Sequence, residues 1–201
     1  MNWRFVTLLA CLAPILAGCV TTAQNALSPA DAKTFRLAEV RVTVPAEATI
    51  VGYDALTTEY AVAKRIPNHE LNAGTETEEA KAWARNHLQA RVKTAMEKQL
   101  GETLRGQRPV RAEVLVKGFQ LSSAVQRIVV GGDYRMVADV TLVDAKSGAV
   151  IVAYPELLHA APALNGWAGA IVQAAYDASN PPGDRVVNGF AEKYKVWLVK
   201  S

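Results

Sequence analysis

The residues Leu16-Ala17-Gly18-Cys19 place a thiol directly after two small side chains. A cysteine reacts as its thiolate, which makes the sulfur of Cys19 a candidate nucleophile. The small side chains before it allow an extended segment to enter the groove of a protease. These residue types suit a site at which a chain is cut and a cysteine sulfur reacts.

The residues before this site have the composition of an export signal. Arg4 gives the first four residues one positive charge and no acid, and the stretch from Phe5 to Ala17 is apolar apart from Thr7. A charged start followed by a short apolar stretch is typical of a secretory signal peptide. The stretch is shorter than the roughly 20 apolar residues that span a bilayer. We therefore predict that residues 1–18 are a cleaved signal peptide; a buried N-terminal helix is the alternative interpretation.

The segment Leu16-Ala17-Gly18-Cys19 resembles the lipobox of bacterial lipoproteins. The resemblance implies recognition of Leu16, Ala17 and Gly18 by a lipoprotein signal peptidase and lipidation of Cys19. Two or more acyl chains hold a protein firmly on a membrane, so the lipid would make the membrane a partner. Val20 follows the cysteine where an Asp would retain such a protein in the inner membrane. The resemblance thus implies the periplasmic face of the outer membrane, with the inner membrane as the alternative.

Composition limits the remaining function classes. The formal net charge of +3 is too small to indicate a nucleic-acid binder. Cys11 leaves with the signal peptide and Cys19 is lipidated, so we expect no disulfide. Residues 19–33 are polar and small, which predicts a lipidated flexible tether. Residues 34–201 suit a single periplasmic domain, since half of the whole chain is apolar.

Hydrophobic periodicity predicts an α+β fold for this domain. We expect about four strands in a mostly antiparallel sheet, with a long helix and a C-terminal helix packed on one face. Gly131-Gly132 predicts a tight hairpin turn, and Pro155 is expected to stop the last strand. Thr75-Glu76-Thr77-Glu78 resembles a capping box at the start of the long helix. The expected strands are 35–44, 110–117, 135–143 and 149–153, and the expected helices are 76–104, 168–176 and one that Asp184 caps. The segment 46–74 has a weak pattern, in which Ile50-Val51 could begin a short strand.

A valine-rich strand, Val140 to Val143, is followed by Asp144-Ala145-Lys146-Ser147-Gly148. This strand and turn resemble those of many small envelope lipoproteins. The arrangement is similar to the TolB N-terminal domain and to auxiliary lipoproteins of ABC-type lipid transporters. The resemblance implies a domain that binds an envelope protein or a lipid.

Motifs for catalysis or metal binding are not found. His69, His87 and His159 have no neighbouring metal-ligand residue in the sequence, and no Gly-x-Ser-x-Gly or Walker-type loop is present. Asp139 and Asp144 lie five residues apart, which places them on opposite faces of a strand. We therefore expect no catalytic residue, no metal and no cofactor. Ser122, Ser123 and Ser147 are expected to bond to local backbone in turns.

The aromatic residues leave two interpretations open. They could fill the core, or they could line a groove for a lipid or a peptide. Trp167, in Asn165-Gly166-Trp167-Ala168-Gly169, is the candidate contact residue, because it lies between glycines near a loop. The aromatic residues in question are Trp83, Trp167, Tyr176, Phe190, Tyr194 and Trp197.

Three functions follow from these observations. The first is a non-enzymatic, membrane-anchored lipoprotein whose periplasmic domain binds another envelope component. The second is a lipid-handling protein or an auxiliary lipoprotein of an ABC transporter. The third is an envelope enzyme with an unrecognised site.

Overall fold

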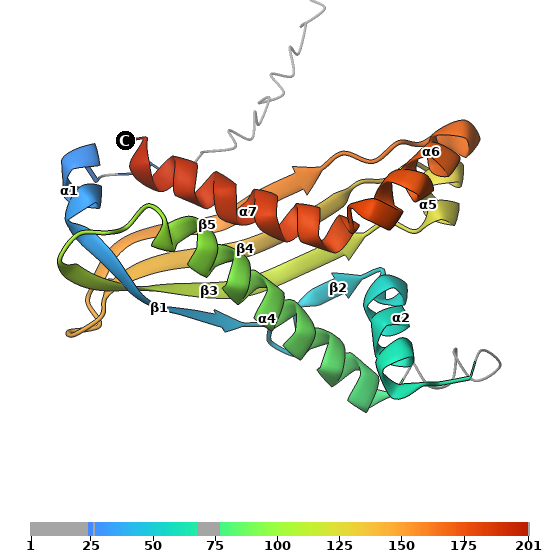
Figure 1. The fold of residues 1–201 in the computed structure, drawn as a ribbon, viewed down its shortest axis with the longest axis horizontal. Coiled ribbons are helices and arrows are strands. Elements are labelled where there is room, and N and C mark those ends of the chain that lie inside the picture. Colours follow the sequence, from blue (N-terminus) through green and yellow to red (C-terminus); the bar gives the residue numbers. More distant parts are fainter. Residues whose placement is uncertain (1–23, 26, 68–76, 201) are drawn as a thin grey trace, which may run out of the picture.

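The structure, a computed structural model, describes residues 24–25, 27–67 and 77–200. It contains a five-stranded, mostly antiparallel sheet with two long helices packed on one face (Figure 1). The predicted α+β class is therefore confirmed. The described strands are β1 (Phe35–Thr43), β2 (Thr49–Val51), β3 (Arg108–Leu121), β4 (Tyr134–Asp144) and β5 (Val150–Ala161). The described helices are α1 (Pro29–Thr34), α2 (Tyr53–Lys64), α4 (Glu78–Gly101), α5 (Ala124–Val129), α6 (Gly166–Ser179) and α7 (Pro182–Val199).

The sheet is built around β3, which pairs with β4 on one side and with both β1 and β2 on the other. Strands β1 and β2 run parallel to β3 and follow one another along the same edge, opposite 108–115 and 118–120. Strands β3, β4 and β5 are antiparallel neighbours. Only the β4–β5 pair is a short hairpin, with the turn at Asp144–Gly148 that the sequence predicts.

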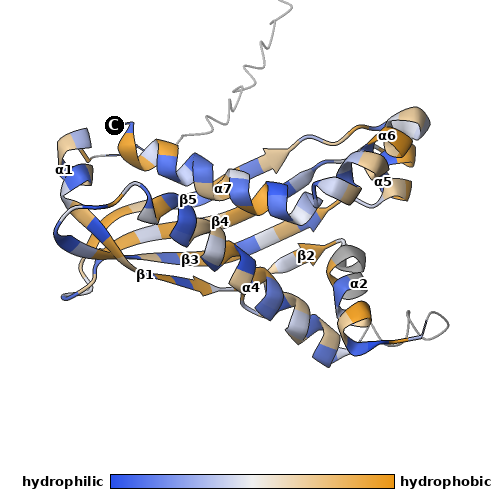
Figure 2. Cartoon of the chain, viewed as in Figure 1, coloured by the Kyte–Doolittle hydropathy of each residue, from blue (hydrophilic) through white to orange (hydrophobic). Residues whose placement is uncertain are grey.

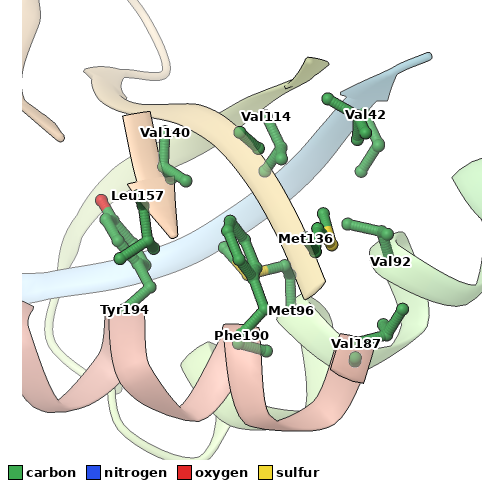
Figure 3. Close-up of a cluster of buried hydrophobic side chains, with 14 of the residues drawn as sticks. Val42, Val92, Met96, Val114, Met136, Val140, Leu157, Val187, Phe190 and Tyr194 are labelled. Atoms are coloured by element: carbon green, nitrogen blue, oxygen red, sulfur yellow. The ribbon is translucent and has the colours of Figure 1, made fainter. Parts of the chain in front are cut away.

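The core lies between one face of the sheet and the helices α4 and α7 (Figure 3). Alternate residues of β3 and β4 point into it, as expected for strands with one buried face. Phe190 and Tyr194 of α7 meet Met96 of α4 and Val140 of β4 there, and all four are fully buried. The opposite face of the sheet carries charged pairs such as Arg111–Glu113 and Lys117–Asp139.

Helix α4 follows from its sequence, with bounds slightly inside the predicted 76–104. Ala84, Leu88 and Val92 recur at helical spacing and are fully buried. Thr77 is the N-cap, and its hydroxyl accepts a hydrogen bond from the amide of Ala80. The capping residue is therefore Thr77; Thr75 and Glu76 of the predicted capping box lie outside the described residues.

The prediction of a tight hairpin at Gly131-Gly132 was wrong. Helix α5 lies between β3 and β4, because Ser123 caps a helix start by accepting a hydrogen bond from Gln126. Gly131 does adopt a positive φ of 80°, but it lies in the link from α5 to β4.

Pro155 does not stop the last strand, which was also predicted wrongly. Strand β5 continues through it to Ala161, since an edge strand can lack one amide donor. The register shifts opposite Ala138 and Val140, and Glu156 has a positive φ of 51° at this point. The geometry is that of a β-bulge on the outer edge of the sheet.

Two segments have more structure than the sequence predicts. Part of the predicted tether, 19–33, lies in α1, which Ser28 and Asp31 cap reciprocally. Asn25 also donates hydrogen bonds to the carbonyls of Trp197 and Leu198, which joins this segment to the end of α7. In the weak segment 46–74, Thr49–Val51 forms β2 as expected, and Tyr53–Lys64 forms the unpredicted helix α2.

The last two helices are longer than predicted. Helix α6 covers Gly166–Ser179 instead of 168–176. Helix α7 begins at Pro182, and Asp184 lies in its first turn without acting as the N-cap. The carboxylate of Asp184 instead pairs with Arg91 of α4 at 2.9 Å.

Candidate functional site

The predicted lipidation site lies outside the described residues. Leu16, Ala17, Gly18 and Cys19 are therefore retained as a sequence-based prediction. Near them, Asn25 is bonded to the C-terminal end of α7. The chain thus enters the domain at the end of the molecule where α1 and the C-terminus lie (Figure 1).

Trp167 is exposed at the opposite end of the molecule, where α5 and α6 lie side by side (Figure 1). It is the second residue of α6, and 72% of its surface is accessible. The other aromatic residues divide between the two interpretations. Phe190 and Tyr194 are fully buried, Trp83 and Trp197 pack partly against the core, and Tyr176 is exposed.

Trp167 belongs to a larger group of exposed apolar side chains on α5, on α6 and on the segments beside them. Most of α6 has the colours of the hydrophobic end of the scale in Figure 2. No residue of α6 before Asp177 is charged. We name this group the distal apolar surface; it consists of Val125, Ile128, Val129, Val130, Leu164, Trp167, Ile171, Val172 and Tyr176. Single exposed apolar residues are ordinary, whereas a group of them on neighbouring elements is the kind of feature found at interaction sites.

A pocket of about 330 Å³ opens within this surface. Its lining is apolar apart from Gln173 and includes Leu164, Val172 and Tyr176. The volume is near the lower limit of small-molecule sites, which is about 300 Å³. The pocket could accept an apolar side chain or part of an acyl chain.

Polar bonds attach α6 to the rest of the domain. Among the residues of α6, only Ala170 and Gln173 are buried. Gln173 accepts a hydrogen bond from the amide of Leu164 at 2.9 Å and donates one to Asp177 at 2.7 Å. Asp177 also accepts hydrogen bonds from the hydroxyl of Tyr134 at 2.8 Å and from Arg185 at 2.8 Å. Helix α6 is thus held mainly through one carboxylate that reaches β4 and α7.

Arg127, a buried residue of α5, extends this hydrogen-bond network. It is 5% exposed, and its Nη1 donates to the carbonyl of Ser122 at 2.7 Å and to the hydroxyl of Tyr134 at 2.6 Å. We name Arg127, Tyr134, Gln173, Asp177 and Arg185 the polar cluster. It joins α5, β4, α6 and α7 at the end of the molecule that carries the distal apolar surface.

The environment shifts the pKa values of two groups in the polar cluster. Burial, followed by the neighbouring Asp177, raises the pKa of the Tyr134 hydroxyl to about 12, so Tyr134 is neutral. Burial opposes ionisation of Asp177, but hydrogen bonds from Gln173, Arg185 and Tyr134 outweigh it and lower the pKa of that carboxyl. Asp177 is therefore ionised at neutral pH.

The histidines that the structure describes have other roles. His87 stacks on Trp83 with ring centroids 4.6 Å apart and pairs with Glu59 at 2.8 Å. His159 packs against Gly189, and burial, followed by the nearby Lys193, lowers its pKa. His69 lies outside the described residues. Within the described part of the chain, no group of three or more His, Cys, Asp or Glu side chains could hold a metal ion.

The serines and acids noted in the sequence have hydrogen-bond or ion-pair partners. These partners lie in a local turn for Ser147, but not for Ser122, for which a local turn had been predicted, or for Asp139. Ser122 donates to the carbonyl of Asp133, and Ser147 bonds to Asp144 in the β4–β5 turn. Asp139 pairs with Lys117. Within the described residues, no helix is long and apolar enough to cross a membrane.

Sequence reasoning missed the distal apolar surface as a group, and it missed the polar cluster entirely. The predicted hairpin turn at Gly131-Gly132 left the apolar run Ile128-Val129-Val130 as a flank of that turn, so its exposure on and after a helix was not foreseen. Asp177, a single acid in an otherwise uncharged helix, was the available signal for the polar cluster.

Residues 76–201 match the model of a protein family described as a family of unknown function, DUF6778. No curated protein matches the chain. Among solved structures, the chain is similar to a predicted lipoprotein from Caulobacter crescentus CB15, with 18% identity and a TM-score of 0.33 over 56% of this chain and 81% of that one.

Two further solved structures are similar. One is a Xanthomonas campestris protein of the family DUF330, with 10% identity and a TM-score of 0.41 over 89% of this chain and 90% of that one. The other is a dodecameric PelC variant from Paraburkholderia phytofirmans, with 12% identity and a TM-score of 0.30 over 85% of this chain and 93% of that one. Similarities at these TM-scores carry no argument about function.

Proposed function

This chain belongs to DUF6778, a family of unknown function, and we propose that it is a lipid-anchored, non-enzymatic lipoprotein of the bacterial envelope that binds another envelope protein. The observation that carries the proposal is the distal apolar surface. Val129, Val130 and Trp167 are 73%, 76% and 72% exposed. Exposing this much apolar surface to water is unfavourable, and a protein partner would bury it.

The position of the surface supports a partner away from the anchoring membrane. Cys19 precedes Gln24 by five residues, which reach at most about 17 Å. The described chain enters the domain at the C-terminal end of α7, and the distal apolar surface lies beyond the other end. Helix α7 has 18 residues and is therefore about 27 Å long. The anchor would hold the α1 end close to the bilayer and leave α5 and α6 projecting from it.

The proposal includes the predicted periplasmic face of the outer membrane, which rests on Val20 after Cys19. Separation of the two membranes by density gradient, followed by detection of the tagged protein, would test it. Recovery with the inner membrane would contradict the outer-membrane assignment and leave the binding proposal intact.

The binding proposal can be tested by pull-down of the tagged full-length protein in mild detergent, read by quantitative mass spectrometry. The test variant is Val129→Ser/Trp167→Ser/Ile171→Ser, which makes the distal apolar surface polar. The matched control is Val62→Ser/Val150→Ser, because Val62 and Val150 are 74% and 66% exposed elsewhere on the domain. A Cys19→Ala variant reports whether membrane anchoring is needed.

We expect one stoichiometric protein that the control retains and the test variant loses. A partner that the test variant also retains would contradict the assignment of this surface. Turnover of an envelope substrate by the purified protein would contradict the non-enzymatic role.

A second candidate is a lipid-handling or transporter-auxiliary lipoprotein. The apolar pocket beside Leu164, Val172 and Tyr176 favours it. It predicts that lipid, in place of a protein, co-purifies with the wild type. Ala163→Trp, at the pocket wall, would then remove the lipid, while Val62→Ser would not.

A further inference from the structure

We propose that the pocket beside Arg127 binds a phosphate group, either free or as a monoester. The pocket is separate from the apolar pocket of the distal surface and has a volume of about 280 Å³. The residues that line it and take part in the argument are Ser122, Ala124, Arg127, Tyr134 and Asp177.

Arg127 has donors that nothing in the described chain accepts. A guanidinium carries five N–H donors. Nη1 of Arg127 uses its two on Ser122 and Tyr134. Nε is enclosed without a partner among the described residues. Both side-chain hydrogen bonds that Arg127 makes to described residues leave from Nη1, so Nη2 has no acceptor there. A buried donor without an acceptor lowers the stability of the fold, and the cost is largest when the donor group is charged. The vacant donors are those that a guanidinium uses to hold a carboxylate or a phosphate.

The net positive charge of the polar cluster also favours binding of an anion. It contains two cations, Arg127 and Arg185, and one anion, Asp177. Tyr134 is neutral because its pKa is raised to about 12. One positive charge is therefore uncompensated within the polar cluster, and Nη2 of Arg185 is also enclosed without a partner. Buried charges in proteins are usually paired.

Asp177 restricts which anions the pocket can bind. It lines the same pocket as Arg127, so a plain carboxylate would meet a carboxylate there. Its Oδ2 accepts only the bond from Tyr134 and retains a free lone pair. A ligand must therefore present an anionic oxygen to Arg127 and a hydroxyl to Asp177. Inorganic phosphate keeps at least one hydroxyl at neutral pH, and a phosphate monoester, whose second pKa is about 6, carries one in its monoanionic form. Sulfate, of similar size, carries no hydroxyl at neutral pH.

The shape of the pocket suits a small polar group. Ser122 and Tyr134 line the pocket and are 3% and 1% exposed, so the surrounding fold holds both hydroxyls in place. Gly52 forms part of the wall, where its positive φ of 80° and its contact with the Leu121 carbonyl exclude a larger side chain. The phosphate could be free in the periplasm or could belong to a lipid headgroup.

The test is isothermal titration calorimetry of the full-length protein in a nonionic detergent, with inorganic phosphate as the probe. Sulfate and acetate are the comparison anions. We expect one phosphate site per chain and binding of sulfate and acetate at least roughly tenfold weaker. Equal binding of all three anions, or no phosphate binding, would overturn the proposal.

Three variants locate the site. Arg127→Gln removes the donors, and Ala124→Leu fills the pocket from an exposed position on α5 while leaving both Arg127 bonds in place. Arg135→Gln is the matched control, because Arg135 is a nearby exposed arginine already paired with Asp133. We expect phosphate binding to be lost in the first two variants and retained in the control. Retention in Ala124→Leu would overturn the proposal even if Arg127→Gln failed to fold.

A competition experiment distinguishes the two sources. A short-chain phosphatidic acid, below its micelle concentration, either displaces bound phosphate or does not. Displacement assigns the site to a lipid phosphate, and failure to displace assigns it to a free phosphate or a soluble ester. Neither result depends on the partner of the distal apolar surface.

Discussion

Helices α6 and α7 follow one another in the chain and differ in how far their apolar side chains are buried. Helix α7 buries Val186, Phe190 and Leu198 completely against the sheet and α4. Helix α6 leaves Trp167, Ile171 and Val172 more than half exposed and buries little besides Gln173. The apolar side chains of α7 stabilise the domain, whereas those of α6 are available to another molecule.

The two helices also differ in the interactions that attach them to the rest of the domain. Helix α7 is held by area removed from water, which is non-directional and insensitive to pH. Helix α6 is held by hydrogen bonds that converge on Asp177. Four predictions follow from this difference between α6 and α7, beginning with a core residue and ending with an exposed one.

Phe190→Ala should have the largest effect on stability. The side chain is fully buried between the sheet and α4, so its loss leaves a cavity in the core. We expect the free energy of unfolding to fall by about 3–5 kcal/mol, measured by urea denaturation. A loss below about 1 kcal/mol would show that α7 is not the principal cover of the sheet.

Tyr134→Phe should have an intermediate effect. It removes the hydroxyl that accepts a hydrogen bond from Arg127 and donates one to Asp177. Leaving these buried partners unsatisfied should cost about 1–3 kcal/mol. Hydrogen exchange should become faster in α6 than in α7, and equal acceleration in both helices would contradict the separate attachment of α6.

Asp177→Asn should change the pH dependence of stability. The folded-state pKa of Asp177 lies below its ordinary value of 3.8. The ionised form therefore stabilises the fold above that pH, and this contribution is lost as the pH falls through the folded-state pKa. In urea denaturation, the variant should be less stable than the wild type near neutral pH, and the difference should narrow in acid. A difference that stays constant with pH would contradict the role of the charge.

Trp167→Ser should have the smallest effect on the isolated protein. Because Trp167 is largely exposed, we expect the free energy of unfolding to change by no more than about 0.5 kcal/mol. The variant should lose the part of the indole emission that comes from a water-exposed side chain, because Trp83 and Trp197 pack partly against the core. A loss of stability comparable to that of Phe190→Ala would show that the distal apolar surface is part of the core.

The sequence predicted the elements whose patterns are local and regular. Val140 and Leu142 alternate with polar residues, and Ala84, Leu88 and Val92 repeat at helical spacing, so β4 and α4 were identified. Helix α2 was missed because Gly52, at its N-cap, offers no capping side chain. Its buried Leu56 belongs to the hydrophobic core and its Tyr60 packs on Trp83 of α4, and the local sequence reveals neither contact.

The polar cluster could not be predicted for a different reason. Arg127, Tyr134, Asp177 and Arg185 come from four elements and are brought together only by the fold. Each has an ordinary local explanation in the sequence. Trp167 was singled out because it lies between glycines near a loop, and its side chain is 72% exposed. Its role as a contact residue stays a prediction.

The two edges of the sheet differ in how they avoid pairing with other chains. The β5 edge is interrupted by Pro155 and by the bulge at Glu156, which are common protections of an edge strand. On the other side of the sheet, the strands β1 and β2 cover the edge of β3 over 108–115 and 118–120. A fragment that begins at residue 76 would keep α4, α7 and the hairpin but leave this edge bare, with its amides and carbonyls unpaired. Such a fragment should self-associate through β3, so the segment from Phe35 to Val51 protects the domain from aggregation.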